Sequence, residues 1–180
     1  MKKLLSLLIT TLLISSCTSS TKVSAPGVVA SCDQIKLLES ANKSVLMPCL
    51  DGSGEMNFHQ LKGPLLINVW GSWCEGCKQE MPYFVELYQN PVFKTGQIQM
   101  LGVNVEEKSK EDAIEYIQKS GMSWPNLVDT SGISKSIFGP GVPVTWFIDK
   151  EGKNVATKIG AYTNKQQLFD QFEKAFGVKL

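Results

Sequence analysis

The chain has 180 residues, of which 43% are hydrophobic and 19% are charged, and its formal net charge is +1. This composition is that of an ordinary globular domain and excludes a disordered protein and a coiled coil. All 18 basic residues are lysines, so the chain lacks the guanidinium fork that binds phosphates, and we expect no nucleic-acid partner. A single histidine, His59, leaves almost nothing for a histidine-rich metal site or a Ser/His/Asp triad.

The N-terminus has the pattern of a secretion signal. Two lysines precede an apolar run, residues 4–14, which is too short to span a bilayer that needs about 20 residues. This pattern favours a signal peptide over a buried helix. The sequence Ile-Ser-Ser-Cys that ends at Cys17 resembles the bacterial lipobox, in which the cysteine is lipidated. We expect a signal peptide over 1–16, a lipid on Cys17, a flexible tether over 17–30 and a location on the extracytoplasmic face of the cell membrane.

Residues 31–62 are expected to form an N-terminal extension. A short helix is predicted over 35–41. The turn sequence Asp-Gly-Ser-Gly at residues 51–54 stands between two extended segments, 44–50 and 56–61, and therefore indicates a hairpin.

Residues 63–180 are expected to form one core in which apolar strands alternate with amphipathic helices. The run 64–70 is apolar almost throughout, which suits a strand buried on both faces. The elements expected after it are a helix over 74–88, a strand over 98–105, a helix over 110–120, a strand over 126–129, a short helix over 133–138, strands over 144–149 and 154–159, and a helix over 164–176. Early β–α–β units call for a parallel centre, and the late hairpin adds antiparallel strands. This order predicts an α/β domain with a central mixed sheet flanked by helices.

The four cysteines after Cys17 fall into two unlike pairs. Cys74 and Cys77 form a C-x-x-C motif, whereas Cys32 and Cys49 lie seventeen positions apart. A structural zinc site usually takes two close pairs, and only one is present. The simpler interpretation is a redox pair at 74/77 and a structural disulfide between Cys32 and Cys49, which would pin the extension onto the domain.

The predicted elements place the C-x-x-C motif at the N-terminus of a helix. The thiolate is the reactive form of cysteine, and the free N–H groups and the dipole of a helix N-terminus favour that anion. Cys74 at the outer end is therefore expected to attack, and Cys77, one turn further in, to be more buried and to act as the resolving thiol. Glu75 either raises the pKa of Cys74 or is a solvated carboxylate at the helix start.

Two neighbours of the motif admit two interpretations each. Glu80 lies three residues after Cys77 and shares its helical face, either as a surface glutamate or as a partly buried carboxylate that moves protons for Cys77. Trp73 is either a core aromatic or a side chain that faces a substrate. Neither a metal nor a cofactor other than the redox-active disulfide is expected.

Two segments together resemble the active site of the thioredoxin superfamily. The segments LLINVWGSWCEGCKQEMP and GVPVTWFID are similar to the C-x-x-C and cis-proline segments of the membrane-anchored TlpA/ResA-type oxidoreductases linked to cytochrome c maturation. This resemblance covers residues 44–176 and implies a thioredoxin-like fold. The site residues it implies are Cys74 as nucleophile, Cys77 as resolving thiol, Glu80 as active-site glutamate, a cis Pro143 packed against the disulfide, and Val142 as the residue whose backbone pairs with a substrate segment.

The chain departs from that pattern at two positions. Asn68 stands where thioredoxin carries a buried acid, so proton transfer has to rely on another group, such as Glu80. Gly76 replaces the common proline of the motif and is expected to loosen the turn.

The resemblance implies a lipid-anchored disulfide reductase. Its expected partners are disulfide-containing exported proteins such as apocytochrome c, and a membrane thiol carrier as electron donor. The alternative is an oxidase or isomerase for the folding of exported proteins. A non-catalytic copper-binding chaperone is disfavoured by the single histidine, and a cysteine peroxidase by the lack of an arginine beside the thiolate.

Overall fold

The structure, a computed structural model, describes residues 25–180. Cys17, the predicted signal peptide and the first part of the predicted tether lie outside the described residues. Within 25–180, no helix has both the length and the apolar character that crossing a bilayer requires.

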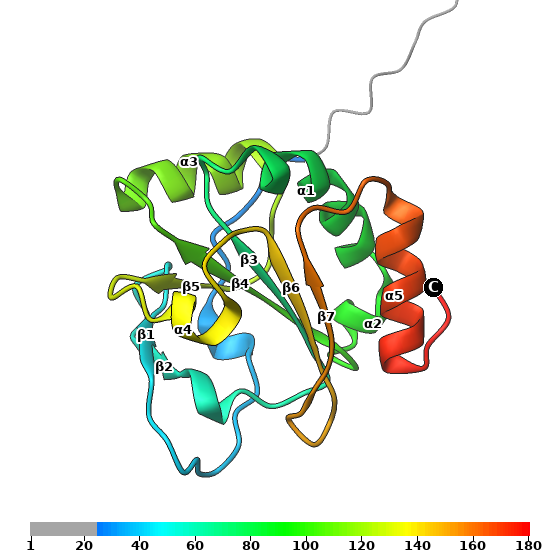
Figure 1. The fold of residues 1–180 in the computed structure, drawn as a ribbon, viewed down its shortest axis with the longest axis horizontal. Coiled ribbons are helices and arrows are strands. Elements are labelled where there is room, and N and C mark those ends of the chain that lie inside the picture. Colours follow the sequence, from blue (N-terminus) through cyan, green and yellow to red (C-terminus); the bar gives the residue numbers. More distant parts are fainter. Residues whose placement is uncertain (1–24) are drawn as a thin grey trace, which may run out of the picture.

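Five strands build a central mixed sheet in the order β5-β4-β3-β6-β7 (Figure 1). Their bounds are Leu65–Trp70 for β3, Gln99–Val105 for β4, Asn126–Asp129 for β5, Val144–Ile148 for β6 and Asn154–Ile159 for β7. The β3–β4 and β4–β5 pairs are parallel, whereas the β3–β6 and β6–β7 pairs are antiparallel. The predicted combination of a parallel centre and a late antiparallel hairpin is confirmed.

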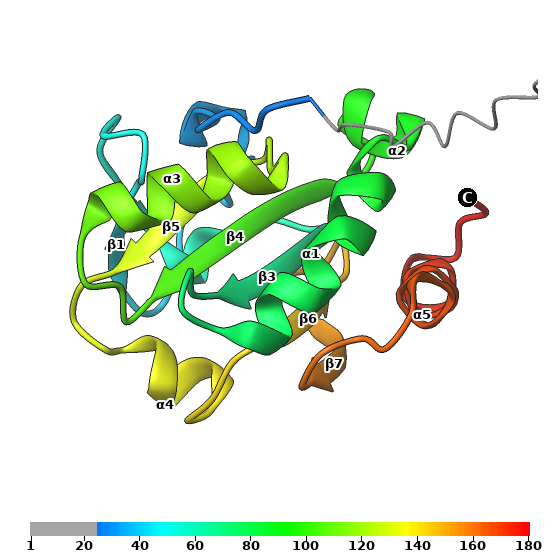
Figure 2. The same ribbon diagram turned by 90° about the horizontal axis from the view of Figure 1, so that it is seen from above.

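Both faces of the sheet are covered, which explains the nearly continuous apolar run of β3. Helices α1 (Glu75–Tyr88), α3 (Lys110–Ser120) and α5 (Lys165–Phe176) pack on one face, around a cluster that includes Leu66 and Trp70. Helix α4 (Ser134–Phe138) and the N-terminal extension cover the other face, around Leu65, Ile67 and Val69. Figure 2 shows α3 and α4 on opposite sides of the sheet.

The N-terminal extension contains the predicted hairpin, in a shorter form. Strands β1 (Leu46–Pro48) and β2 (Glu55–Asn57) pair antiparallel as a separate two-stranded sheet. The turn between them requires its glycines, because Gly52 and Gly54 have φ values of 82° and 140°. The second predicted strand ends early in a 3₁₀ turn, Phe58–Gln60, because the Asn57 side chain accepts a hydrogen bond from the N–H of His59 and caps that turn.

The prediction of a helix over 35–41 is wrong. The only helical turn near it is the 3₁₀ segment Cys32–Gln34, after which the chain is extended. Leu38 donates its N–H to the carbonyl of Gln60, and Lys62 donates to the carbonyl of Lys36. Pairing with a distant segment thus outweighs the weak local preference for a helix. A short helix that was not predicted, α2 (Pro91–Lys94), follows α1 with Asn90 as its N-cap.

Cys32 and Cys49 are joined in a disulfide, and both are buried. Cys49 forms a bridge with Leu127 of β5, and the N–H of Leu50 bonds to the carbonyl of Asn126 at 2.8 Å. The disulfide therefore ties the start of the described chain to a hairpin that is itself docked on the edge of the sheet.

Replacing both Cys32 and Cys49 by alanine is expected to lower the melting temperature without removing the other disulfide. Closing a loop of this length stabilises a fold by about 3 kcal/mol in the chain-entropy model, which corresponds to roughly 6–12 °C in a chain of this size. Calorimetry measures the shift, and a thiol titration of the oxidised variant checks that Cys74 and Cys77 stay bonded. An unchanged melting temperature would contradict a stabilising role.

Candidate active site

The second disulfide lies at the N-terminus of α1, directly after β3. Cys74 and Cys77 are bonded at 2.06 Å, with 5.2 Å between their Cα atoms. Cys74 is the N-cap of α1, and its Sγ accepts a hydrogen bond from the N–H of Cys77 at 3.1 Å. Cys77 is fully buried and Cys74 is 5% exposed, so Cys74 offers the outer sulfur. A disulfide held in this way is arranged for thiol exchange, since the helix N-terminus stabilises the thiolate that reduction releases.

Pro143 packs against the active-site turn. The Val142–Pro143 peptide bond is cis. A Cβ added to Gly76 would lie 3.3 Å from Cδ of Pro143 and 3.5 Å from Cβ of Ala161. The middle of the C-x-x-C turn and the loop before β6 are therefore in close contact, and a Cβ at residue 76 would require Pro143 to shift slightly.

Val142 lies two residues before the start of β6 and is half-buried. Among the described residues, no backbone hydrogen bond involves its N–H or its C=O, whereas the next carbonyl, that of Pro143, accepts from Gly160. Val142 therefore presents one free donor and one free acceptor next to Pro143, which contacts the active-site turn.

Trp73 is not a core aromatic, because its side chain is 48% exposed. Its indole Nε1 donates to the carbonyl of Val105, at the end of β4, at 3.2 Å. The ring folds back over Gly71, where a Cβ would approach the indole nitrogen to 2.6 Å. The sequence does not determine the direction of this side chain. In the structure it lies at the rim of the active-site turn.

Glu107 anchors the turn that carries Trp73, and the sequence analysis missed it. Its carboxylate accepts from the Ser72 N–H at 2.5 Å, the Ser72 hydroxyl at 2.6 Å and Nδ2 of Asn104 at 2.7 Å. Asn104 is fully buried in β4, which makes it a rigid support. An acidic residue just past the end of a strand parallel to β3 is the signal that points to such a contact, because parallel strands end at the same edge of a sheet.

Glu80 is fully buried, so its interpretation as a surface glutamate is wrong. One carboxylate oxygen accepts from the N–H of Tyr162 at 3.0 Å, and the other accepts from Nδ2 of Asn68 at 3.3 Å. Burial raises the pKa of Glu80 to about 7, although these two hydrogen bonds and the charge of Lys158 oppose the shift. Glu80 lies one helical turn after Cys77, on the same side of α1. Because its pKa is about 7, it exchanges a proton near neutral pH.

Asn68, the partner of Glu80, leaves one of its own polar atoms without a hydrogen bond. Its Oδ1 is buried and has no hydrogen-bond partner among the described residues. Asn68 therefore holds Glu80 with one hydrogen bond, and this bond favours the ionised carboxylate against the effect of burial.

Within residues 25–180, one group of potential metal ligands occurs, and it is formed by Cys32, Cys49 and Asp51. Its two sulfurs are bonded to each other, and a disulfide sulfur is not the thiolate that binds zinc. This group therefore belongs to the structural disulfide and not to a zinc site.

Comparison with known proteins agrees with this geometry. A model of the AhpC/TSA family matches residues 40–157. The chain belongs to this family. It is 36% identical to the thiol-disulfide oxidoreductase ResA of Geobacillus thermodenitrificans over 102 residues, which are 56% of this chain and 57% of that protein. It is 34% identical to ResA of Bacillus subtilis over 105 residues, 57% of each chain. The match thus spans less than two thirds of these relatives.

The thioredoxin-like fold implied by the sequence resemblance is confirmed. The crystal structure of a thiol:disulfide interchange protein DsbE from Chlorobium tepidum superimposes with a TM-score of 0.62 at 22% identity, covering 76% of this chain and 95% of that chain. At this identity the superposition establishes the fold, and the chemistry has to be argued from the site itself.

Proposed function

We propose that this protein is a thiol–disulfide oxidoreductase that reduces disulfides of exported proteins. The observation that carries the proposal is the Cys74–Cys77 disulfide at the N-terminus of α1, against which the loop of Val142 and Pro143 packs. The names of the ResA relatives support the same class of reaction.

The reaction begins with both cysteines reduced. The Cys74 thiolate attacks one sulfur of a substrate disulfide, forms a mixed disulfide and releases the first substrate thiolate. The Cys77 thiolate then attacks Sγ of Cys74, releases the second substrate thiolate and closes the 74/77 disulfide. Two electrons thus pass to the substrate, and the N–H of Cys77 stabilises the Cys74 thiolate that makes the first attack.

Glu80 serves the second step by accepting the proton of Cys77. A carboxyl group with a pKa of about 7 is half ionised near neutral pH, which suits a general base for a buried thiol. Asn68, which takes the place of a buried acid, holds this carboxyl and does not replace it, because an amide has no proton to exchange near neutral pH.

Substrate binding uses the backbone of Val142 and the rim formed by Trp73. An extended substrate segment gains two hydrogen bonds from Val142 and adds a short strand there. The half-exposed indole of Trp73 provides an apolar surface at the rim of the active-site turn. Recognition through the backbone accepts varied sequences, as a reductase with several substrates requires.

We further propose that the protein works outside the cytoplasmic membrane, anchored by a lipid on Cys17, and that apocytochrome c is a substrate and a membrane thiol carrier the electron donor. The pattern of residues 1–17 supports the anchor, and the resemblance to TlpA/ResA-type proteins supports the partners. The buried Cys32–Cys49 disulfide supports an oxidising compartment.

The reduction potential of the 74/77 pair is the measurement that tests the direction of the reaction. We expect a value near that of thioredoxin, about −270 mV, from equilibration with dithiothreitol buffers. A value near −120 mV would assign the protein to oxidation of exported proteins instead. The variant with Cys32 and Cys49 replaced by alanine is the control, because its potential reports the 74/77 pair alone.

A further inference from the structure

Lys158 of β7 lies on the same face of the sheet as the buried pair of Asn68 and Glu80. Asn68 of β3 stands opposite Thr145 of β6, and Thr145 stands opposite Lys158. Side chains that stand opposite each other in antiparallel strands point to the same face of a sheet. Because Asn68 donates to Glu80, this row leads from the buried carboxyl to the edge strand, where Lys158 is half-buried.

The ammonium group of Lys158 folds over the loop that follows β7. Its Nζ donates to the carbonyl of Ile159 at 3.0 Å and lies 5.6 Å from the centre of the Tyr162 ring, a cation–π contact. It also lies close to Gly160, where an added Cβ would approach the nitrogen to 3.9 Å. These contacts hold the ammonium group against residues 159–162.

The same loop supports Glu80 and the active-site turn. The N–H of Tyr162 donates to one carboxylate oxygen of Glu80 at 3.0 Å. Ala161 packs against the C-x-x-C turn, since a Cβ added to Gly76 would lie 3.5 Å from the Cβ of Ala161. The segment that Lys158 holds is therefore the one that positions Glu80.

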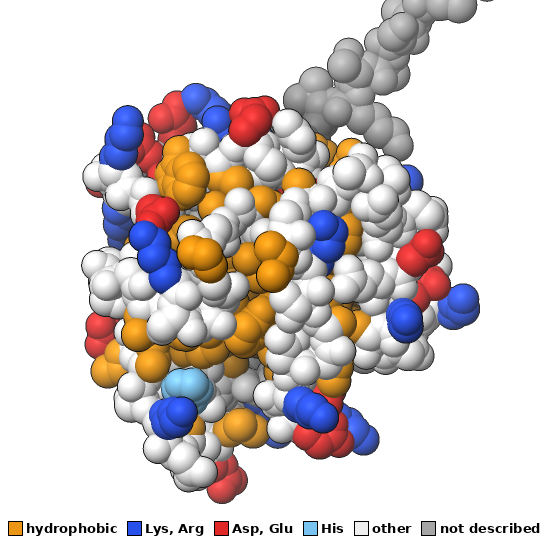
Figure 3. Space-filling view, in the orientation of Figure 1, with side chains coloured by type: hydrophobic (Ala, Val, Ile, Leu, Met, Phe, Trp, Pro, Cys, Tyr) orange, Lys and Arg blue, Asp and Glu red, His pale blue; other side chains and the backbone are white. Residues whose placement is uncertain are grey.

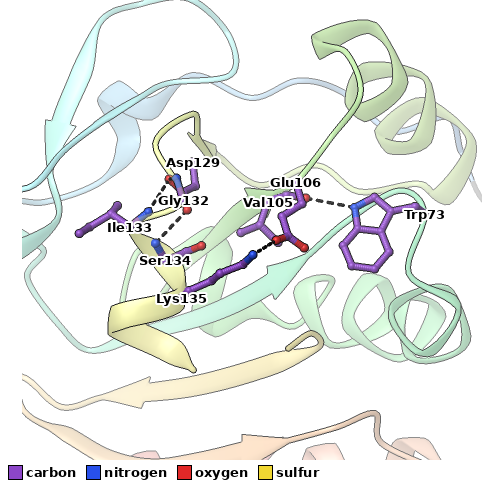
Figure 4. A network of polar contacts seen from close by, with 8 residues as sticks. All are labelled: Trp73, Val105, Glu106, Asp129, Gly132, Ile133, Ser134 and Lys135. Atoms are coloured by element: carbon purple, nitrogen blue, oxygen red, sulfur yellow. Dashed lines mark hydrogen bonds and ion pairs between the residues drawn. The ribbon is translucent and has the colours of Figure 1, made fainter. Parts of the chain in front are cut away.

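The charge of Lys158 is not compensated by a carboxylate. Figure 3, in the orientation of Figure 1, shows hydrophobic side chains over the middle of the face, beside β6 and β7, and acidic ones mostly toward the rim. Within residues 25–180, Lys158 forms no ion pair. By contrast, Lys135 of α4 pairs with Glu106 (Figure 4), and Lys165 pairs with Glu86 at 2.7 Å. The positive charge of Lys158 is thus left to act on the buried carboxyl.

The other titratable groups that face Glu80 are neutral near neutral pH. Burial, reinforced by the charge of Glu80, holds the pKa of Tyr116 in α3 and of Tyr162 above the usual range. Cys77, one turn earlier on α1, is the group with which Glu80 exchanges a proton. Burial raises the pKa of Glu80, and among the charged groups it is Lys158 that opposes this shift.

We propose that Lys158 is a positioning residue for Glu80, whose ammonium group fixes the loop that holds this carboxyl and favours its ionised, proton-accepting form. The inference rests on the proposed function, because it assigns a role in the resolving step of that reaction. In this step the Glu80 carboxylate takes the proton of the Cys77 thiol, and the Cys77 sulfur attacks Sγ of Cys74. The substrate thiolate leaves with the electron pair of the broken S–S bond.

The pH dependence of the resolving step tests the proposal. Reduced protein is mixed with dithiobis(nitrobenzoate), and the release of the second nitrothiobenzoate reports the closure of the 74/77 disulfide. Lys158→Met keeps an apolar stem and removes the charge. We expect the midpoint of its rate profile to rise by about 0.5 pH, which slows the step about threefold at pH 6 and leaves it unchanged at pH 9.

Two further substitutions separate charge from packing. Lys158→Glu should raise the midpoint by about 1 pH, a loss of about tenfold at pH 6, and Lys158→Arg should keep the wild-type profile. High salt should reduce these differences, because Lys158 is only half-buried. A rate loss that is equal at every pH, as a purely structural defect produces, would overturn the proposal, and so would a Lys158→Glu profile that coincides with the wild type.

Lys165→Met is the matched control, because Lys165 also lies over an aromatic ring, that of Phe169 at 5.9 Å, but pairs with Glu86. Its profile should equal that of the wild type. Infrared difference spectroscopy of the oxidised protein, with Glu80→Gln to assign the band, follows the same carboxyl without turnover. An unchanged titration in Lys158→Met would overturn the proposal. A shifted titration in a protein whose wild type releases no second nitrothiobenzoate would instead overturn the proposed function and leave the action of Lys158 on Glu80 in place.

Discussion

Cys77→Ser is expected to stop turnover and to leave the protein joined to its substrate through Cys74. The outer sulfur of Cys74 still forms the mixed disulfide, but the buried group one turn into α1 no longer resolves it. The resolving thiol acts within the same molecule, so its loss removes the advantage of proximity, and we expect turnover to fall at least a hundredfold. Non-reducing electrophoresis and mass spectrometry of the covalent complex measure the outcome.

Cys74→Ser is the matched variant, since it removes the other sulfur of the same disulfide. It should lose turnover equally and yield no covalent complex, because Cys77 is fully buried and does not reach a substrate. A complex that forms through Cys77 in this variant would reverse the two roles. The double alanine variant of Cys32 and Cys49 should keep its turnover, since that pair lies in the N-terminal extension.

Glu80→Gln is expected to stabilise the oxidised protein at pH 8 but not at pH 4.5. In the unfolded chain this carboxyl ionises near its ordinary pKa of 4.5, whereas in the folded protein it keeps its proton up to about pH 7. Between these values the folded state binds more protons than the unfolded state, so stability falls as pH rises and levels off above pH 7. The difference amounts to about 3 kcal/mol, and glutamine does not incur it.

The difference in melting temperature between Glu80→Gln and wild type, followed from pH 4.5 to 8, measures this effect. It should grow by roughly 6–12 °C over that range, most of it below pH 7.5. Using oxidised protein keeps Cys74 and Cys77 from titrating. Glu39→Gln, an exposed carboxylate, is the control and should show a constant difference. A flat difference for Glu80→Gln would mean that the folded carboxyl ionises at its ordinary pKa.

The same variant bears on mechanism. If Glu80 accepts the proton of Cys77, the rate of resolution should rise with pH through about 7 in the wild type and lose that step in Glu80→Gln. The stability and rate measurements share one titrating group, so they should report the same apparent pKa within the uncertainty of each method.

Local patterns in the sequence determine most of the secondary structure of this protein. The apolar run of β3, the amphipathic periods of α3 and α5, and the turn glycines before β2 each act within a few residues, and each prediction is confirmed. The place of the C-x-x-C motif follows from the same logic, because a buried strand directly before the motif and a helix directly after it leave Cys74 at the N-cap. The prediction from local pattern fails for segment 35–41, because its backbone pairs with residues 60–62, far along the chain.

The tertiary structure alone decides the environment of the polar groups around the disulfide. Glu80 lies in the first half of α1, and Glu107 lies just past the end of β4. Glu80 is enclosed by Asn68 and Tyr162, whereas Glu107 accepts a hydrogen bond from Ser72, which follows the neighbouring strand β3. The pairing of Glu106 with Lys135 likewise joins two elements that are 29 positions apart. Burial and charge pairing depend on which elements the sheet order brings together, and no spacing within one element encodes that order.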